Sequence, residues 1–238
     1  MSYANGPRIV TDGLVCCLDA ANRKSYAGSG STWYDLSGNG NNATLAGSTA
    51  APTFSSNDSG YFDFDGNDDY MTIPSVNSET NFNIGDDYTV SFWVNVNSTQ
   101  AVANTRSIIE KWEGSGPYPY VFRYLTNETV NSNLYNGTTS NPSNTTSSVA
   151  DRWVNVSYVV KWSTNNSKLY VNATQEDSDS LILTGNISTN SPVYIGRRGG
   201  GSPLNCKMKF ASFNIYNKAL SANEVQQNYN ALKGRFGL

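Results

Sequence analysis

Histidine is absent from the 238 residues of this sequence. The absence excludes Ser-His-Asp and Cys-His catalytic arrangements and removes the commonest zinc ligand. Charged residues are also scarce, at 15%, and 16 Lys and Arg against 19 Asp and Glu give a net charge of −3. Nucleic-acid binding depends on a basic patch that releases counterions, and no basic run is present. We therefore predict no nucleic-acid partner.

Long apolar runs and cysteines are the next shortages. No run approaches the roughly 20 residues that span a bilayer, and Met1–Arg8 has neither the charged nor the apolar region of a signal peptide. We predict no membrane association. Cys16, Cys17 and Cys206 form an odd set, which argues against a disulfide scaffold. We expect buried thiols in a protein made in a reducing cytoplasm, with a bridge from Cys206 to Cys16 or Cys17 as the alternative.

What the chain has in abundance is aromatic residues, at 12%, together with Asn, Ser, Thr and Gly. Aromatic and β-branched side chains fill pleated surfaces, and small polar residues make turns. Period-two alternation is clearest from Tyr88 to Val96 and from Trp153 to Trp162. We expect a hairpin from Tyr61–Phe64 and Tyr70–Ile73, joined by Asp65–Asp69. The further predicted strands are Leu14–Leu18, Arg106–Trp112, Tyr120–Leu125, Leu169–Val171, Leu181–Leu183, Val193–Ile195 and Cys206–Tyr216, the last with a bulge between Phe210 and Phe213.

One helix is expected near the C-terminus. Ser221 and Glu224 have the spacing of a capping box, Leu220 and Val225 that of a hydrophobic staple, and Gly234 that of a C-terminal cap. The chain therefore reads as an all-β protein with one short C-terminal helix. We predict an N-terminal arm over residues 1–12 and a single domain over residues 13–238.

Three groups of residues resemble a known family. They are Gly13–Asn22 with Trp33–Asn42, Tyr61–Tyr70 with Tyr88–Val94, and Phe213–Val225. In this order they resemble the laminin G-like, concanavalin A-like jelly-roll domains, in the version found among bacteriophage structural proteins. The resemblance implies a two-sheet antiparallel jelly-roll β-sandwich.

The same resemblance implies a function on a virus particle. It suggests a non-catalytic virion structural protein, foremost a capsid (head) decoration protein that displays a lectin-like fold able to bind cell-surface glycans. Its partners would be the major capsid protein or tail and fibre components, its location the virion surface, and its oligomeric state is left open. A tail or fibre-associated carbohydrate-binding adhesin and a free lectin are the alternatives. The termini, Met1–Arg8 and Arg235–Leu238, would either dock on a partner or fray.

Enzymatic activity is not expected. A glycosidase on this fold needs two carboxylates on one face of a strand. The nearest run, Glu176–Asp179, lacks a closing Glu and is interpreted as a solvated turn. Asp63 and Asp65 have the required even spacing but lead into a turn, and they remain the one arrangement left open.

Two sets of binding residues are predicted. Sugar sites combine an aromatic platform with polar side chains; here Trp112, Tyr118 and Tyr120 flank a Gly/Pro loop, and Arg197 and Arg198 lie on a second loop. The alternative is that the aromatic residues belong to the core, which is favoured for Trp112 and left even for Tyr118.

A calcium ion would fit the family and the oxygen-rich turn between the two hairpin strands, although turn chemistry alone explains these residues and is favoured. No other cofactor and no metal requirement for folding is expected. The predicted calcium ligands are Asp63, Asp65, Asn67, Asp68 and Asp69.

Overall fold

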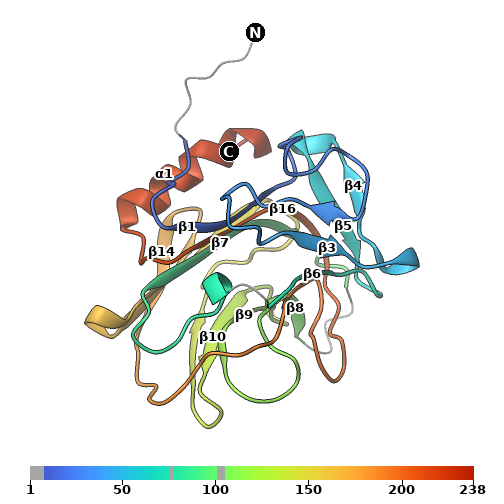
Figure 1. Ribbon diagram of the computed structural model, residues 1–238. Coiled ribbons are helices and arrows are strands. Elements are labelled where there is room, and N and C mark those ends of the chain that lie inside the picture. Colours follow the sequence, from blue (N-terminus) through green and yellow to red (C-terminus); the bar gives the residue numbers. More distant parts are fainter. Residues whose placement is uncertain (1–7, 76–77, 101–104) are drawn as a thin grey trace.

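A computed structural model describes residues 8–75, 78–100 and 105–238. Its described strands form two antiparallel sheets that face each other as a sandwich (Figure 1). The predicted all-β jelly-roll architecture with one C-terminal helix is confirmed. The first sheet runs in the order β14 (Thr174–Ser180), β13 (Asn166–Val171), β12 (Val154–Lys161), β7 (Tyr88–Val96), β16 (Lys207–Tyr216), β5 (Tyr61–Asp65) and β4 (Thr53–Ser55), and β1 (Leu14–Asp19) pairs with β16.

Among the described residues, the second sheet contains eight strands. Its order is β11 (Ser140–Asn144), β10 (Val130–Tyr135), β9 (Tyr118–Tyr124), β8 (Arg106–Glu110), β15 (Val193–Ile195), β6 (Met71–Ile73), β3 (Ala43–Leu45) and β2 (Thr32–Trp33). The described helices are α1 (Ala222–Leu232) and the short 3-10 turns η1 (Ser48–Ala50), η2 (Asn57–Ser59), η3 (Ser78–Thr80), η4 (Trp162–Thr164) and η5 (Lys233–Phe236).

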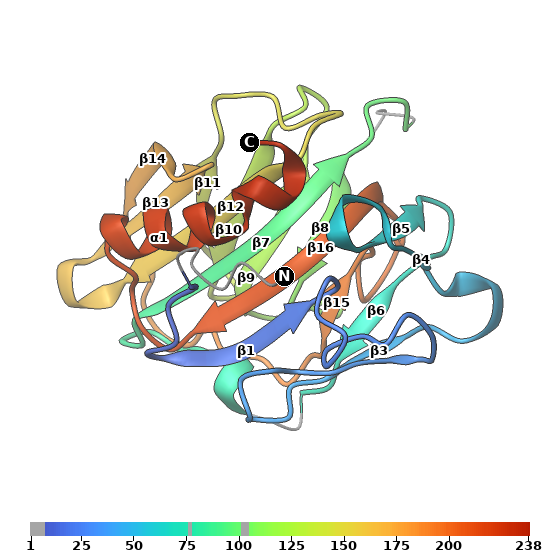
Figure 2. The same cartoon turned by 90° about the horizontal axis from the view of Figure 1, so that it is seen from above.

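Strand β7 is buried on both faces. Tyr88, Val90, Phe92, Val94 and Val96 are completely inaccessible and belong to the core between the sheets. The opposite face would meet solvent in an isolated sandwich, but α1 and η5 lie across the outside of this sheet (Figure 2). Trp93 is therefore only 1% exposed. The predicted bulge is present in β16, where the register with β7 shifts between Phe210 and Ser212.

Helix α1 begins as predicted. The Glu224 amide donates to the Ser221 side chain, and the Ser221 amide donates to the Glu224 carboxylate, which completes the capping box. Helix α1 ends at Leu232, but Gly234 is not its left-handed cap, because the chain continues into η5, which contains Gly234 and is capped by Gly237 with φ 73°. Among the described residues no helix has both the length and the apolar character to cross a membrane.

Described segments near both ends of the chain make contacts at α1 and η5. Residues 1–7 of the predicted arm lie outside the described residues, but the Val10 amide donates to Asn228 on α1. At the other end Arg235 pairs with Asp19 at 2.8 Å, and Phe236 packs on Trp93. The C-terminal segment, predicted either to dock on a partner or to fray, thus has its aromatic ring packed within the chain.

The predicted hairpin of β5 and β6 is wrong. The two strands belong to different sheets, β5 pairing with β16 and β4, and β6 with β15 and β3. Asp65–Asp69 is therefore a corner between the sheets. Turn residues favour a change of direction, yet they do not specify whether the next strand pairs with the previous one.

Two other segments differ from the prediction. Leu181–Leu183 is not a strand, because Leu181 and Leu183 reach the core from irregular backbone while Ile182 is exposed. Glu176–Asp179 is not a turn but part of the edge strand β14. The polar sequence concealed this strand, since an edge strand has little apolar burial to reveal it. The three cysteines are buried and free, as expected, so no disulfide joins them.

Candidate functional site

An aromatic and cationic cluster lies at one end of β8 and β9. Trp112 follows β8, Tyr118 begins β9, and their rings meet edge-on with centroids 5.8 Å apart. Tyr118 in turn lies 5.4 Å from Tyr135 on β10. The guanidinium of Arg198 stands 4.2 Å from the Trp112 ring centre and that of Arg123 stands 5.7 Å from it. We call these five residues the Trp112 cluster.

The loop between β15 and β16 carries Arg198 to this position. A Cβ atom at Gly199 would lie 2.4 Å from the Trp112 carbonyl oxygen and 2.4 Å from the Tyr194 ring. Only glycine allows so close a backbone approach, and it seats the loop against Trp112. Arg197 lies over the ring of Tyr70 instead, at 4.5 Å, and is not part of the cluster.

Buried polar groups support the cluster from the sheet. Glu110, whose side chain is 0% exposed, accepts a hydrogen bond from Arg123 Nε at 2.8 Å and another from Ser107 at 2.6 Å. Asn133 donates to the Tyr118 hydroxyl at 3.2 Å. Within the described part of the chain, four buried polar atoms of the cluster and its support have no hydrogen-bond partner; they are Trp112 Nε1, Arg198 Nε, Asn133 Oδ1 and Glu110 Oε2.

The structure thus brings together Trp112, Tyr118 and Arg198 of the five predicted sugar-binding residues. Tyr120 does not belong with them: it is completely buried between the sheets and donates its hydroxyl to the Thr80 carbonyl. Sequence reasoning missed Arg123, Asn133 and Tyr135. Alternation in β9 contained a signal for Arg123, because Tyr120, Phe122 and Tyr124 point inward and place Arg123 on the other face.

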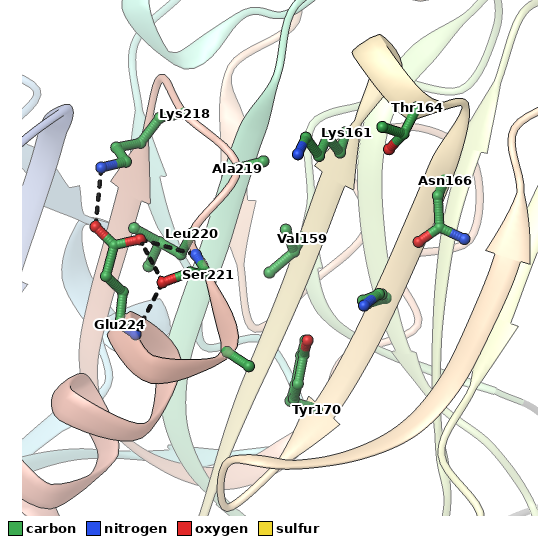
Figure 3. Close-up of a pocket in the computed structure, with 12 residues that line it drawn as sticks. Val159, Lys161, Thr164, Asn166, Tyr170, Lys218, Ala219, Leu220, Ser221 and Glu224 are labelled. Carbon is green, nitrogen blue, oxygen red and sulfur yellow. Dashed lines mark hydrogen bonds and ion pairs between the residues drawn. The ribbon is translucent and has the colours of Figure 1, made fainter.

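A groove of about 550 Å³ lies on the outer face of the other sheet, between β12, β13 and the start of α1 (Figure 3). Lys161 and Lys168 come from the two strands, and Lys218 comes from the segment before the helix. Lys161 and Lys168 are close in sequence, on the paired strands β12 and β13, whereas Lys218 lies about 50 residues beyond Lys168. No pattern in the sequence indicated that Lys218 lines the same groove.

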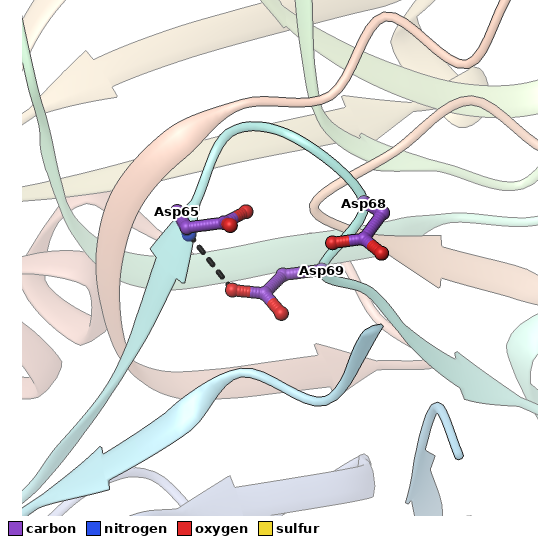
Figure 4. Close-up of side chains that lie close together, drawn as sticks. All are labelled: Asp65, Asp68 and Asp69. Atoms are coloured by element: carbon purple, nitrogen blue, oxygen red, sulfur yellow. Dashed lines mark hydrogen bonds between the residues drawn. The ribbon is translucent and has the colours of Figure 1, made fainter. Parts of the chain in front are cut away.

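The acidic corner gathers three of the five predicted calcium ligands. Carboxylate oxygens of Asp65, Asp68 and Asp69 lie within 4.8 Å of one another (Figure 4). The Asp65 amide donates to Asp69 at 2.8 Å, and both the amide and the side chain of Asn67 donate to Asp65. Asp63 lies outside this group, directly opposite Lys209 on β16.

Two carboxyl groups of this corner have pKa values shifted in opposite directions. Burial raises the pKa of Asp69, and the negative charges of its acidic neighbours raise it further, against the hydrogen bond from Asp65. Burial also acts on Asp65, but hydrogen bonds from Asn67 and the following amides hold the pKa of that carboxyl below its usual range. Oxygen donors of this kind suit Ca²⁺, which takes six to eight of them. Hydrogen bonds within the turn already occupy several of these carboxylate oxygens. Calcium binding at this corner stays a prediction.

The carboxylates of β14 are all engaged. Glu176 accepts hydrogen bonds from the Thr146 and Ser147 amides, Asp177 from the Asn144 amide, and Asp179 from the Ser143 hydroxyl. These bonds link the edge of one sheet to β11, at the edge of the other, and to the segment that follows β11. They hold the pKa of Glu176 low, although burial opposes them.

Comparisons with known proteins agree with this architecture. The model of the family described as the concanavalin A-like lectin/glucanases superfamily matches residues 65–226. A botulinum-like toxin, eBoNT/J of Enterococcus sp. (strain 3G1_DIV0629), is 24% identical over 155 residues, which is 62% of this chain and 12% of the toxin.

Solved structures show the same fold. The binding domain of Paraclostridial Mosquitocidal Protein 1 is similar with a TM-score of 0.72 and 21% identity, over 92% of this chain and 52% of that one. The botulinum neurotoxin serotype D ligand-binding domain in complex with N-acetylneuraminic acid gives 0.68 and 18%, over 92% and 51%. This chain spans about half the length of these solved domains.

Proposed function

Since the chain belongs to the concanavalin A-like lectin/glucanases superfamily, we propose that it is a non-catalytic glycan-binding protein whose site is the Trp112 cluster. The observation that carries the proposal is the contact of the Trp112 ring with both Tyr118 and Arg198. Aromatic rings accept the apolar face of a sugar, while nearby polar groups select its hydroxyls.

The unpartnered polar atoms of the cluster and of its supporting residues fit this use. Trp112 Nε1 and Arg198 Nε are donors, whereas Asn133 Oδ1 and Glu110 Oε2 are acceptors. A buried polar atom without a partner costs free energy. A sugar hydroxyl both donates and accepts, so a small shift of the glycine-rich loop that carries Arg198 would let a bound sugar satisfy groups of either kind.

The relatives support a binding role in general terms. One neighbour is described as a binding domain, and another was solved with N-acetylneuraminic acid. Because this chain corresponds to about half of each of those domains, the bound sugar of the second neighbour supports the class of ligand and does not locate the site.

A non-catalytic role is supported by the carboxylates. The β14 carboxylates are held by hydrogen bonds between the sheet edges. Asp63 and Asp65 lie opposite Lys209 and Lys207 across the strand pair, a placement typical of cross-strand charge pairing. The chain also contains no histidine, which excludes the catalytic arrangements that depend on one.

The place of the protein on a virus particle remains a prediction from its sequence motifs. We propose a capsid decoration protein at the virion surface, with a tail or fibre adhesin and a free lectin as alternatives. A particle map distinguishes them: copies in icosahedral arrangement on the head support decoration, and a few copies at the tail support an adhesin. Absence from purified particles would favour a free lectin.

A glycan array tests the proposed site directly. We expect the wild-type protein to bind a defined set of glycans, and Trp112→Ala and Arg198→Ala to lose about tenfold or more in affinity. Arg23→Ala is the matched control, because Arg23 is exposed on another part of the surface. Thermal melting confirms that each variant is folded. Wild-type protein that binds nothing, or folded Trp112 and Arg198 variants that bind like Arg23→Ala, would refute the site.

A further inference from the structure

The groove beside α1 has the composition of a binding site that is separate from the Trp112 cluster. Its volume of about 550 Å³ falls within the range of about 300–1,000 Å³ that is usual for small-molecule sites. Val159, Ala219 and Leu220 supply apolar surface, and the Tyr170 hydroxyl points into the groove from β13 (Figure 3). An apolar floor with polar walls suits a sugar ring better than a bare inorganic ion.

The charge of the groove comes from two lysines. Lys218 is neutralised, because it pairs with Asp12 at 2.6 Å and with Glu224 at 2.9 Å. Lys161 and Lys168 form no ion pair within the described part of the chain. The nearest strand beyond Lys168 presents Ser178 opposite it, so no carboxylate directly faces that ammonium group across the sheet.

The capping box uses two amides at the start of α1. Its first-turn amide at Glu224 and the Ser221 amide are already used by the capping box. The Asp87 carboxylate accepts hydrogen bonds from Ser163; it keeps its negative charge, but within the described part of the chain it forms no ion pair with Lys161 or Lys168. The two unpaired ammonium groups are therefore the main source of positive potential, and they stand out on a chain with a net charge of −3.

We propose that this groove binds a carboxylated sugar, such as a uronic acid unit of an acidic polysaccharide. The ammonium groups of Lys161 and Lys168 would hold the carboxylate through charge-assisted hydrogen bonds. The apolar floor would meet the sugar ring, and Tyr170, Asn166 and Thr164 would meet its hydroxyls. The inference deepens the proposed glycan binding, on which it rests for the class of ligand, and assigns a second site on the opposite sheet.

The test is calorimetric titration with an oligomer of galacturonic acid, compared with the same oligomer after methyl esterification. We expect the acid to bind, the ester to bind at least about tenfold more weakly, and added salt to weaken binding of the acid. The double variant Lys161→Gln, Lys168→Gln should lose about tenfold in affinity for the acid. Lys24→Gln is the control, since Lys24 is exposed outside the groove.

Three results would overturn the inference: no binding of the acid, equal binding of acid and ester, or equal affinities of the double variant and Lys24→Gln. Competition by inorganic sulfate at equal concentration would show that the groove is a simple anion site and would overturn the assignment to a sugar.

Trp112→Ala separates the two proposals. If it abolishes binding of the acid while the lysine variant does not, the acid binds at the Trp112 cluster, and only the groove assignment fails. Binding in the groove without any loss in the Trp112 variants on the array would make the cluster the assignment that fails.

Discussion

The indole ring of Trp93 stacks on the ring of Phe236, with centroids 4.4 Å apart and planes 27° from parallel. Phe236 also lies 4.5 Å from Trp153, and Tyr229 of α1 stacks on Trp93 at 5.6 Å. The last residues of the chain thereby cover the outer face of β7 and pack on a small hydrophobic cluster that is separate from the core between the sheets.

Replacing Trp93 should destabilise the protein strongly. Trp93→Ala removes a side chain that is 1% exposed and leaves a cavity between the sheet and the helix, so we expect a loss of about 3–5 kcal/mol in the free energy of unfolding. Denaturant titration measures it. Tyr34→Ala is the control, because Tyr34 is 54% exposed, and it should change stability by less than about 0.5 kcal/mol. A loss well under 1 kcal/mol for Trp93→Ala would contradict this packing.

Lys111 should make stability depend on pH. Its ammonium group is buried and donates to the Ser191 carbonyl, and burial lowers its pKa from 10.5 to about 8. Between these two values the unfolded chain holds the proton that the folded chain has released, so stability rises with pH. Lys111→Met removes the effect. The stability of the wild type relative to this variant should rise by about 2–3 kcal/mol between pH 7 and pH 10.

Tyrosine and cysteine groups that titrate at high pH cancel in this difference, because both proteins contain them. Lys24→Met serves as the exposed counterpart and should track the wild type across the range. A difference between wild type and Lys111→Met that stays constant from pH 7 to pH 10 would show that Lys111 keeps its ordinary pKa.

The acidic corner can be tested with Asp69→Asn. The pKa of Asp69 is raised in the folded protein. The stability that its protonated form contributes is therefore lost as pH rises through the folded pKa, and at pH 7 the ionised carboxylate lowers the free energy of unfolding. Without calcium, the variant should therefore melt above the wild type. We expect a chelator to leave wild-type melting unchanged, because folding is predicted to need no metal. If a chelator lowers the wild-type midpoint and Asp69→Asn abolishes that response, calcium is structural at this corner.

We predict no hydrolysis of β-glucans or bacterial surface polysaccharides. Glycoside cleavage needs an acid with a raised pKa and a second carboxylate at a set separation. Reducing ends measured after incubation should stay at background for the wild type, Asp63→Asn and Asp65→Asn alike. Activity in the wild type that disappears in either variant would overturn the non-catalytic assignment.

The local features of this protein could be derived from its sequence. Alternation predicted the inward face of β7, and the capping box predicted the first turn of α1, because both patterns record contacts between residues close together in the chain. The sequence could not decide whether Trp93, on the other face, is buried, because its burial depends on which segments cover the sheet.

The tertiary structure alone decided the contacts between distant segments. In it, β6 lies in the opposite sheet from β5, and the polar run Glu176–Asp179 belongs to an edge strand. Tyr120 lies in the core, and Arg198 lies over the ring of Trp112. A period-two pattern states which side chains share a face, but it is the same for every possible neighbouring strand. The choice among neighbours, and with it the composition of both candidate binding sites, depends on packing across the whole chain.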